Sequence, residues 1–501
     1  MNDWAELGHA LEGITSSGAA EIREDGEWLA ELAAPHCELR VEGKNPLVHL
    51  WSDKRNLTRR VLRVREQTPD RVVLEVQRFG RAKPGRLEVV RAASPRPPKR
   101  VTREQFCAEF GRILAESFPD ATVESLSASP DLENSLSGIF ARGCMHEGSR
   151  AWAVMAAAPG ESAAAIEGIL AFGILWLDWL RGHAKVRAVE GLRIFLPERS
   201  GGCVRERCAV LSSSAGVEVL EFRPADGRMA KMDPADTGNL KSLLVSHGEA
   251  ESARVAARNA IRGIHALALH IPPAGNEIGL RLVPGTSEVS LGFRGLKFGS
   301  WSSKDGIRFG LGDSREKFTS SSESALDELI RNLDLHRNSL APDTRHGLYR
   351  AAAERWLETL VLDDPTRLDA HLDPRHLYSQ VPALTAGDRG VIDLLGVTRG
   401  GRLVVIELKA SEDIQLPIQA ADYWLRVCRH QRQGDFHRYG YFAGIELDPK
   451  PPLVWIVAPA FRFHSATEIL LRYLSPEMRV TRIGLNENWR RGLKVIFRHQ
   501  A

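Results

Sequence analysis

Residues 387–409 are expected to form a β-hairpin that carries two acids and a lysine. The segment 398–401 has the composition of a turn and lies between two apolar runs rich in β-branched residues. Asp393 lies on the first predicted strand, whereas Glu407 and Lys409 end the second, where alternation places them on one face. A carboxylate at the end of such an apolar strand is costly unless a cation or strong donors satisfy it. The pattern therefore predicts a metal site if Asp393 approaches Glu407.

This set of side chains suits the hydrolysis of a phosphodiester. Mg²⁺ takes oxygen ligands and keeps several of its waters, so Asp393, Glu407 and the backbone carbonyl of Leu408 would be enough to hold it. A metal held in this way lowers the pKa of a water molecule and offsets charge on a phosphate. Lys409 would orient the attacking water or offset the charge that develops on the phosphate.

Further polar residues before and after the hairpin extend the predicted site. Glu354 and Glu358 lie four residues apart on a predicted helix, and one of them would face the metal. Gln380, on the preceding strand, would support the site or contact nucleic acid. Gln419 and Tyr423 share one face of the following helix, where they would hydrogen-bond a phosphate and brace the lysine. Alone, Gln419 and Tyr423 would be an ordinary amphipathic helix face, and Glu354 is more typical of a surface charge than of a ligand. The order of all these residues around the hairpin favours catalysis.

The order of these residues resembles the signature of the PD-(D/E)XK nucleases. Asp393 matches the first acid of that signature, and Glu407-x-Lys409 matches its second motif. Ile392 stands where the signature usually has proline. The resemblance implies that the two acids bind Mg²⁺ (or Mn²⁺) and that the lysine assists catalysis.

The resemblance extends to the residues that flank the signature. Gln419-x-x-x-Tyr423 is similar to an additional motif of RecB-type members, and residues 350–430 most resemble the catalytic domain of NucS-type endonucleases. The C-terminal domain is therefore expected to have a restriction-endonuclease-like α/β core, and DNA is its expected substrate.

The chain is too long for one compact core, and its patterns predict a multidomain α/β protein. It has 501 residues, and a hydrophobic fraction of 43% with mixed charges is typical of a globular protein. Strand and helix patterns in the C-terminal part predict a mixed sheet. Four domains are expected: a β-rich, basic domain at 1–98, an α/β unit at 102–230, a mixed α/β middle region at 235–340 and a nuclease-like α/β domain at 343–501.

Residues 102–230 repeat the order of the C-terminal domain. The segment 179–181 (Trp-Leu-Arg) has the place of 424–426, which has the same sequence, and the predicted strand 192–197 has the place of 454–459. Any two α/β units can share such an order, so the pattern alone leaves the repeat open.

The aligned positions of this repeat lack the chemistry of the hairpin. Met155 and Ala157 fall opposite Glu407 and Lys409. We therefore expect residues 102–230 to be a degenerate, catalytically inert copy of the nuclease-like fold.

Positive charge is concentrated in the N-terminal part of the chain. Between Lys54 and Arg103 there are 16 Lys and Arg against 4 Asp and Glu, an excess of +12, whereas the whole chain carries +3. Such a segment is typical of a phosphate-binding surface, and equally of the solvated face of a β domain. The residues expected to contact nucleic acid are Arg59, Arg60, Arg63, Arg78, Arg81, Lys83 and Gln380.

Composition indicates a cytoplasmic protein without membrane association. The six cysteines are scattered without CxxC pairs, which favours neither a disulfide framework nor a zinc finger. The N-terminus has no signal-peptide pattern. The longest apolar run, 166–180, is interrupted by Glu167 and Asp178 and is too short to span a bilayer, so it is expected to form a buried helix.

The sequence therefore predicts a metal-dependent DNA nuclease, specifically an endonuclease, with a place in DNA repair or in defence against foreign DNA. The alternative is a non-catalytic nucleic-acid-binding or assembly protein that retains the nuclease fold, as residues 102–230 are expected to do. A third interpretation has a partner protein target the chain through residues 235–340. Homo-oligomers are compatible with each of these.

Overall fold

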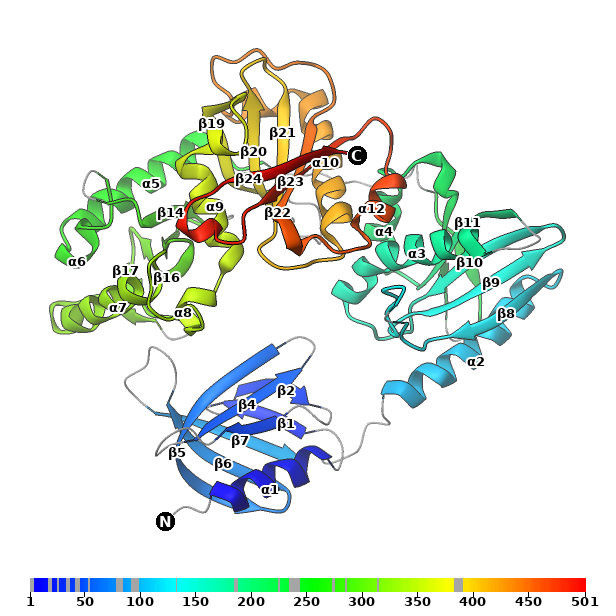
Figure 1. The fold of residues 1–501 in the computed structure, drawn as a ribbon, viewed down its shortest axis with the longest axis horizontal. Coiled ribbons are helices and arrows are strands. Elements are labelled where there is room, and N and C mark those ends of the chain that lie inside the picture. Colours follow the sequence, from blue (N-terminus) through cyan, green and yellow to red (C-terminus); the bar gives the residue numbers. More distant parts are fainter. Residues whose placement is uncertain are drawn as a thin grey trace. The chain divides into compact units, whose positions relative to one another are not determined.

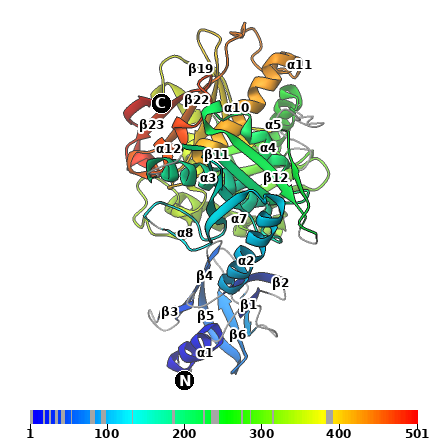
Figure 2. The same cartoon turned by 90° about the vertical axis from the view of Figure 1, so that its right-hand side faces the viewer.

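The computed structural model divides into two compact units, Met1–Gln105 and Phe106–Ala501 (Figures 1 and 2). It describes the whole chain except residues 1–3, 17–19, 25–26, 33–36, 41–45, 53–54, 78–83, 92–98, 132, 184–187, 224–225, 234–243, 273–274, 284–285, 313–314 and 383–390.

The first unit is an antiparallel sheet with one helix packed along it (Figure 1). Its strand order is β2-β1-β7-β6-β5-β4-β3. The helix α1 (Trp4–Ser16) packs Leu7, Leu11 and Ile14 against sheet residues such as Val61, because these three recur at helical spacing. The strands are β1 Ala20–Glu24, β2 Glu27–Leu32, β3 Cys37–Arg40, β4 Leu47–Ser52, β5 Arg55–Thr68, β6 Arg71–Gln77 and β7 Gly85–Arg91.

The second unit begins with a mixed sheet, called here the upstream sheet, in the order β13-β12-β11-β10-β9-β8. The strand β10 is apolar on both faces, because Val154 packs in the core of α2 and Met155 packs in the core of α3. Its elements are α2 Lys99–Ser117, β8 Ala121–Ser127, β9 Ala141–Glu147, β10 Arg150–Ala156, α3 Ala163–His183, β11 Ala188–Pro197, α4 Gly202–Cys208, β12 Val217–Phe222 and β13 Met229–Lys231.

The helix α3 contains the longest apolar run of the sequence. By length and composition it would be able to cross a membrane, and half of its most apolar window is buried within the protein. Ile169, Leu170 and Ile174 are among its buried residues, and they belong to a core shared with β10, β11 and α10. Its apolar character therefore has an explanation in packing, because α3 covers the upstream sheet and also contacts α12.

The last sheet, called here the C-terminal sheet, has the order β19-β20-β21-β22-β23-β24. Ile406 and Leu408 of β21 pack in the core of α9, whereas Val405 packs in that of α10. The elements are α9 Ala353–Asp363, β19 Leu372–Pro382, β20 Val391–Thr398, β21 Leu403–Leu408, α10 Leu416–Gln433, α11 Asp435–Arg438, β22 Leu453–Pro459, α12 Thr467–Arg472, β23 Arg479–Leu485 and β24 Val495–Gln500.

The upstream and C-terminal sheets have the same order and the same strand directions. In each, two antiparallel pairs are followed by two parallel pairs and a last antiparallel pair. The crossover helices also correspond, because α3 and α10 follow the third strand and α4 and α12 follow the fourth. The repeated order of the sequence is therefore matched by a repeated topology.

Between these two sheets, the chain forms an antiparallel sheet, called here the middle sheet, in the order β14-β15-β16-β17-β18. Leu326, Ile330 and Leu333 of α7 pack in its core together with Ile261 of α5. The elements are α5 His247–Arg262, α6 His265–Ala268, β14 Ile278–Leu282, β15 Val289–Phe293, β16 Leu296–Ser302, β17 Gly306–Phe309, β18 Glu316–Lys317, α7 Glu323–His336 and α8 Gly347–Arg350.

The expected mixed α/β class is confirmed, while several elements differ from the sequence pattern. Residues 247–268 form two helices, α5 and α6, and Gly263 caps the end of the first. The strands β16 and β23 were not expected, because glycine and serine interrupt the first and polar residues the second. The helix α1 was also not expected in a region of strand-like patterns.

Candidate active site

The expected hairpin is formed by β20 and β21. The two strands pair antiparallel with Leu394 opposite Ile406, and Asp393 is the next residue outward. The backbone amide of Leu408 donates to Oδ2 of Asp393 at 3.1 Å. The hairpin therefore brings the carboxylate of Asp393 to the end of β21, where Glu407 lies.

A glycine closes the hairpin turn. The amide of Gly401 donates to the carbonyl oxygen of Thr398 at 2.9 Å. Gly401 has a φ of +81°, and a Cβ at this position would lie 2.3 Å from the carbonyl oxygen of Glu446. Both the backbone conformation and the close approach therefore require glycine here.

Glu407 is a buried acid with an incomplete set of partners. Glu407 is 2% exposed, and its Oε1 lies 3.4 Å from Nζ of Lys409. Oε2 has no hydrogen-bond partner among the described residues. Burial raises the pKa of Glu407 well above its usual range, and the charge of Asp393 raises it further against the opposing effect of Lys409. A buried carboxylate oxygen without a donor is a position that favours a cation.

Lys409 lies just beyond the end of β21, where its backbone amide donates to the carbonyl oxygen of Val457 at 2.9 Å. Its Nζ lies between Glu407 and Asp413, whose Oδ2 is 3.5 Å away. Burial lowers the pKa of Lys409, but the surrounding carboxylates, including Glu354, outweigh burial and the net pKa is raised. The lysine is therefore held as a cation against the buried acid.

Gln380 bridges two acids from a strained backbone position. Its Nε2 donates to Oε2 of Glu358 at 3.2 Å and to Oδ1 of Asp393 at 3.3 Å. Its φ of +52° is in the left-handed region, which is uncommon for a residue with a Cβ. The strand β19 therefore presents this amide to both carboxylates at a cost in backbone strain.

Two arginines that were not expected from the sequence contact the same acids. Glu358 is 1% exposed, and it forms ion pairs with Arg281 at 2.7 Å and with Arg355 at 2.9 Å. Arg355 also lies 3.5 Å from Oδ1 of Asp393. The i,i+3 spacing of Arg355 and Glu358 on a helix was a sequence signal for the ion pair between these two residues. No local signal indicated Arg281, which lies on β14 of the middle sheet.

The other expected residues on the flanking helices lie near this cluster. Burial raises the pKa of Tyr423, and the charges of Glu407 and Asp393 raise it further. Oε1 of Gln419 is buried and has no hydrogen-bond partner in the described part of the chain. Neither side chain hydrogen-bonds Lys409 within the described residues, so the expected bracing contact is not formed here.

Glu354 also belongs to the cluster. Burial raises the pKa of Glu354, although the charge of Lys409 and a hydrogen bond from the backbone of Ala410 oppose this. The sequence favoured a surface charge over a metal ligand at this position, whereas Glu354 is half-buried and interacts with Lys409.

The charges of the cluster leave room for a divalent cation. Among the described residues, no group of three or more His, Cys, Asp or Glu side chains is arranged to hold a metal ion. Two carboxylates and a backbone carbonyl, the set expected from the sequence, do not require such a group. The cluster contains five acidic and three basic side chains that interact with one another. The acids are Glu354, Glu358, Asp393, Glu407 and Asp413, and the cations are Arg281, Arg355 and Lys409. Together with the unpartnered oxygen of Glu407, this excess fits a bound Mg²⁺.

The basic residues expected to bind nucleic acid lie on the first unit. Arg60 pairs with Gln77 and Arg63 with Glu75, so a bulge between them places both exposed arginines on one face of the sheet. Arg59 precedes them on β5. Outside the described residues lie Arg78, Arg81 and Lys83.

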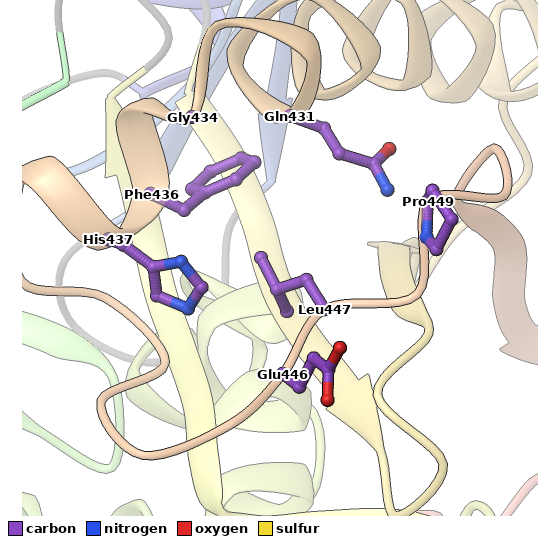
Figure 3. Close-up of a pocket in the computed structure, with 7 residues that line it drawn as sticks. All are labelled: Gln431, Gly434, Phe436, His437, Glu446, Leu447 and Pro449. Atoms are coloured by element: carbon purple, nitrogen blue, oxygen red, sulfur yellow. The ribbon is translucent and has the colours of Figure 1, made fainter.

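A pocket of ≈ 300 Å³ lies at the opposite end of α10 (Figure 3). Gln431 at this pocket is 12 residues from Gln419 along the helix, roughly 18 Å at 1.5 Å per residue. The pocket is therefore separate from the acidic cluster. It is lined by Gln431, Gly434, Phe436, His437, Glu446, Leu447 and Pro449.

Comparisons with known proteins add little to this geometry. A scan against protein-family models finds no match, and a search of curated proteins finds no relative. Among solved structures, a repair endonuclease from Pyrococcus abyssi is similar over 44% of this chain and 95% of its own length, with 12% sequence identity and a TM-score of 0.18. A similarity of this size carries no argument about activity, so the functional argument rests on the residues of the cluster.

Proposed function

We propose that this protein is a metal-dependent DNA nuclease, specifically an endonuclease, with its active site at the end of β21. One observation carries the proposal: Glu407 is buried, and its Oε2 has no partner among the described residues although Asp393 and Lys409 are adjacent. A purely structural acid would be expected to have its oxygens satisfied. A site that binds a cation leaves such an oxygen available.

The proposed ligands of Mg²⁺ (or Mn²⁺) are the carboxylates of Asp393 and Glu407 and the carbonyl of Leu408. When bound, this ion would supply charge neutralisation on the phosphate and a water of lowered pKa. The backbone amide of Leu408 and the amide of Gln380 hold the Asp393 carboxylate in one orientation. Preorganised ligands of this kind spare the site reorganisation during the reaction.

Lys409 is proposed to act on the reacting phosphate. Its net pKa is raised, so it is a cation at neutral pH, and its ammonium group lies 3.4 Å from Glu407. A fixed positive charge beside the metal ligands would stabilise the negative charge that develops on phosphate or orient the attacking water. The half-buried Gln419 and Tyr423 would offer an amide and a hydroxyl to a phosphate oxygen or to a water.

The arginines on β5 are proposed to hold the DNA backbone. Arg60 and Arg63 are exposed on one face of the first unit. Contacts of this type are electrostatic and do not depend on sequence, so binding would weaken steeply as salt is added. A cytoplasmic role in DNA repair or in defence against foreign DNA would suit such a nuclease.

The test is a cleavage assay on single- and double-stranded DNA and RNA with Mg²⁺ or Mn²⁺. The wild type is expected to cut DNA, whereas Lys409→Ala and Glu407→Ala should each reduce the rate by about 10²–10³, the usual loss when a residue that stabilises the transition state is removed. Lys450→Ala is the matched control, because Lys450 pairs with Asp448 on the surface. Equal rates in all of these variants would refute the assignment.

A binding protein without catalytic activity is the second candidate. The upstream sheet favours it, because that sheet has the topology of the C-terminal one and carries Met155 and Ala157 where the other has Glu407 and Lys409. Tight DNA binding that does not depend on metal, without cleavage of any substrate, would favour this candidate over the nuclease.

A further inference from the structure

The registers of the two mixed sheets identify which residues correspond. The amide of Lys409 donates to the carbonyl oxygen of Val457 on β22 at 2.9 Å. The amide of Ala157 donates in the same way to the carbonyl oxygen of Phe195 on β11 at 3.0 Å. Met155 pairs with Ile194 on β11 as Glu407 pairs with Ile456 on β22. Met155 and Ala157 therefore stand in the upstream sheet where Glu407 and Lys409 stand in the C-terminal sheet.

The same registers place an arginine at the position of the first acid. Arg142 pairs with Met155 across β9 and β10, just as Asp393 follows the Leu394–Ile406 pair across β20 and β21. Arg142 is 8% exposed and donates to the carbonyl oxygen of Ser129 at 2.7 Å. It has a structural contact of its own, and the upstream position carries neither an acidic pair nor a lysine.

The segments that follow α4 and α12 also meet through equivalent residues. Leu211 and Leu474 form an antiparallel bridge. Leu211 lies three residues beyond the end of α4, and Leu474 lies two residues beyond the end of the equivalent helix α12. The bridge is reciprocal, because the amide of Ser212 donates to the carbonyl oxygen of Tyr473 at 2.9 Å and the amide of Ser475 donates to that of Val210 at 2.8 Å. A contact in which a residue meets its own counterpart is the mark of a two-fold axis.

The helix contacts around this bridge follow the same symmetry. The helix α3 packs on α12, and the equivalent helix α10 packs on α4. Apolar residues of both copies belong to one continuous core, among them Leu170 of α3, Leu196 of β11, Ile418 of α10 and Leu470 of α12. The chain therefore contains an internal pseudo-dimer, and the face through which the two copies pair is already buried within it.

We propose that each chain cuts only one strand of a duplex, so that its product is a nick. This inference rests on the proposed nuclease function. The two strands of a duplex are related by two-fold axes, so a two-fold nuclease pair would bring one site to each strand. Here the axis relates the acids and lysine of the C-terminal sheet to Arg142, Met155 and Ala157. The second strand meets no hydrolytic site, and a second chain cannot supply one through the face that is already used.

The reaction at the single site is a hydrolysis that consumes one water for each nick. The water oxygen bonds to phosphorus, one backbone P–O bond breaks, and the proton of the water passes to the departing oxygen. The two ends remain held together by the intact strand. Linear DNA then requires a second, independent nick close by on the other strand.

Digestion of a supercoiled plasmid by the full chain with Mg²⁺ tests this inference. Nicked circles are expected to accumulate as the first product, with linear DNA appearing only later. At equal consumption of the supercoiled substrate, the ratio of linear to nicked DNA should not change with protein concentration. Linear DNA as the first product, or a linear fraction that rises with protein concentration at equal consumption of the supercoiled substrate, would overturn the inference and leave the nuclease function intact. No product on any DNA would overturn both.

Two variants at equivalent positions serve as a matched pair. Glu407→Gln is expected to abolish nicking, whereas Met155→Leu, a replacement of similar volume in the inert copy, should nick at roughly the wild-type rate. Loss of nicking in both variants, with circular dichroism showing that Met155→Leu is folded, would show that the upstream position takes part in the chemistry and would contradict the inference.

Discussion

The variant Glu407→Gln separates a carboxylate kept for a cation from one that supports the fold. The replacement keeps the shape of the side chain and removes a negative charge that is 2% exposed and adjacent to Asp393. Without metal and at a pH above the folded-state pKa of Glu407, the free energy of unfolding is expected to rise by about 1–3 kcal/mol, because the variant no longer carries a buried charge beside a second acid. The melting temperature would rise by less than the roughly 2–4 °C per kcal/mol typical of 150–250 residues, because the unit Phe106–Ala501 is larger.

The pH dependence of this gain has a definite sign. The pKa of Glu407 in the folded protein lies well above the value of about 4.3 expected when the chain is unfolded. Between these two values the folded state binds a proton that the unfolded state has lost, so the wild type loses stability as pH rises through this window. Glutamine does not titrate. The advantage of the variant should therefore be small below the unfolded pKa and should grow as pH rises.

Urea unfolding in EDTA from acid to neutral pH, repeated with Mg²⁺, measures both effects. The wild type would gain about 2.7 kcal/mol at a metal concentration of 100 times Kd, and the variant much less. The exposed Glu477→Gln is the control and should change neither quantity. The reasoning fails if Glu407→Gln is less stable than the wild type in EDTA, or if the difference shrinks as pH rises.

Three further predictions concern the supporting residues. Arg281→Ala should lower the free energy of unfolding, measured in urea, by about 1–3 kcal/mol. This is less than the roughly 3–5 kcal/mol for a buried charge left with no partner, because Glu358 keeps a second arginine. Unchanged stability would contradict the buried pair. Gln380→Gly should be about 1 kcal/mol more stable than Gln380→Ala, since the φ of +52° suits glycine, while both slow cleavage by losing the bridging amide; equal melting temperatures would count against the strain. The double variant Arg60→Ala with Arg63→Ala should reduce the salt slope of DNA binding by about 1.8, roughly 0.9 for each phosphate contact, in a fluorescence titration; an unchanged slope would show that this face does not contact DNA.

The part of the fold that the sequence predicted is the part whose signal is local. Two apolar runs rich in β-branched residues, on either side of a glycine turn, predicted β20 and β21, and the structure confirms both the pairing and the turn at Gly401. Glu407 lies near the end of β21 and Lys409 just beyond it, so their proximity followed from the extended backbone alone. The topology of the repeat was also predictable, because the order of helices and strands is written along the chain.

What the sequence did not predict depends on residues brought together from distant segments. Arg281 lies 77 residues before its partner Glu358, on a strand whose pattern carries no sign of an active site. The left-handed backbone at Gln380 is likewise set by the tertiary contacts of β19, since glutamine has no local preference for it. Arg479 and Arg482 interrupt the apolar pattern of β23, so the sequence did not predict this strand. It forms because it pairs with β22.

The middle sheet, which had no chemistry in the sequence, holds the helix that carries Glu358. Arg337 at the end of α7 is fully buried and donates to the carbonyl oxygens of Leu348, Ala351 and Ala352, the residues that lead into α9, and also to that of Phe293 on β15. Burial lowers the pKa of Arg337 to about 9, and these carbonyls supply the partners that its guanidinium needs.

A second contact fixes the same helix against the middle sheet. Gly295, in the turn between β15 and β16, approaches so closely that a Cβ there would lie 2.3 Å from the carbonyl oxygen of Arg355. Arg355 is the residue that pairs with both Glu358 and Asp393. The position of α9, and with it the orientation of the acids, therefore depends on contacts from residues 278–337. A C-terminal sheet expressed without them would lose Arg281 and the support of α9, so the middle sheet and the acidic cluster depend on the same contacts.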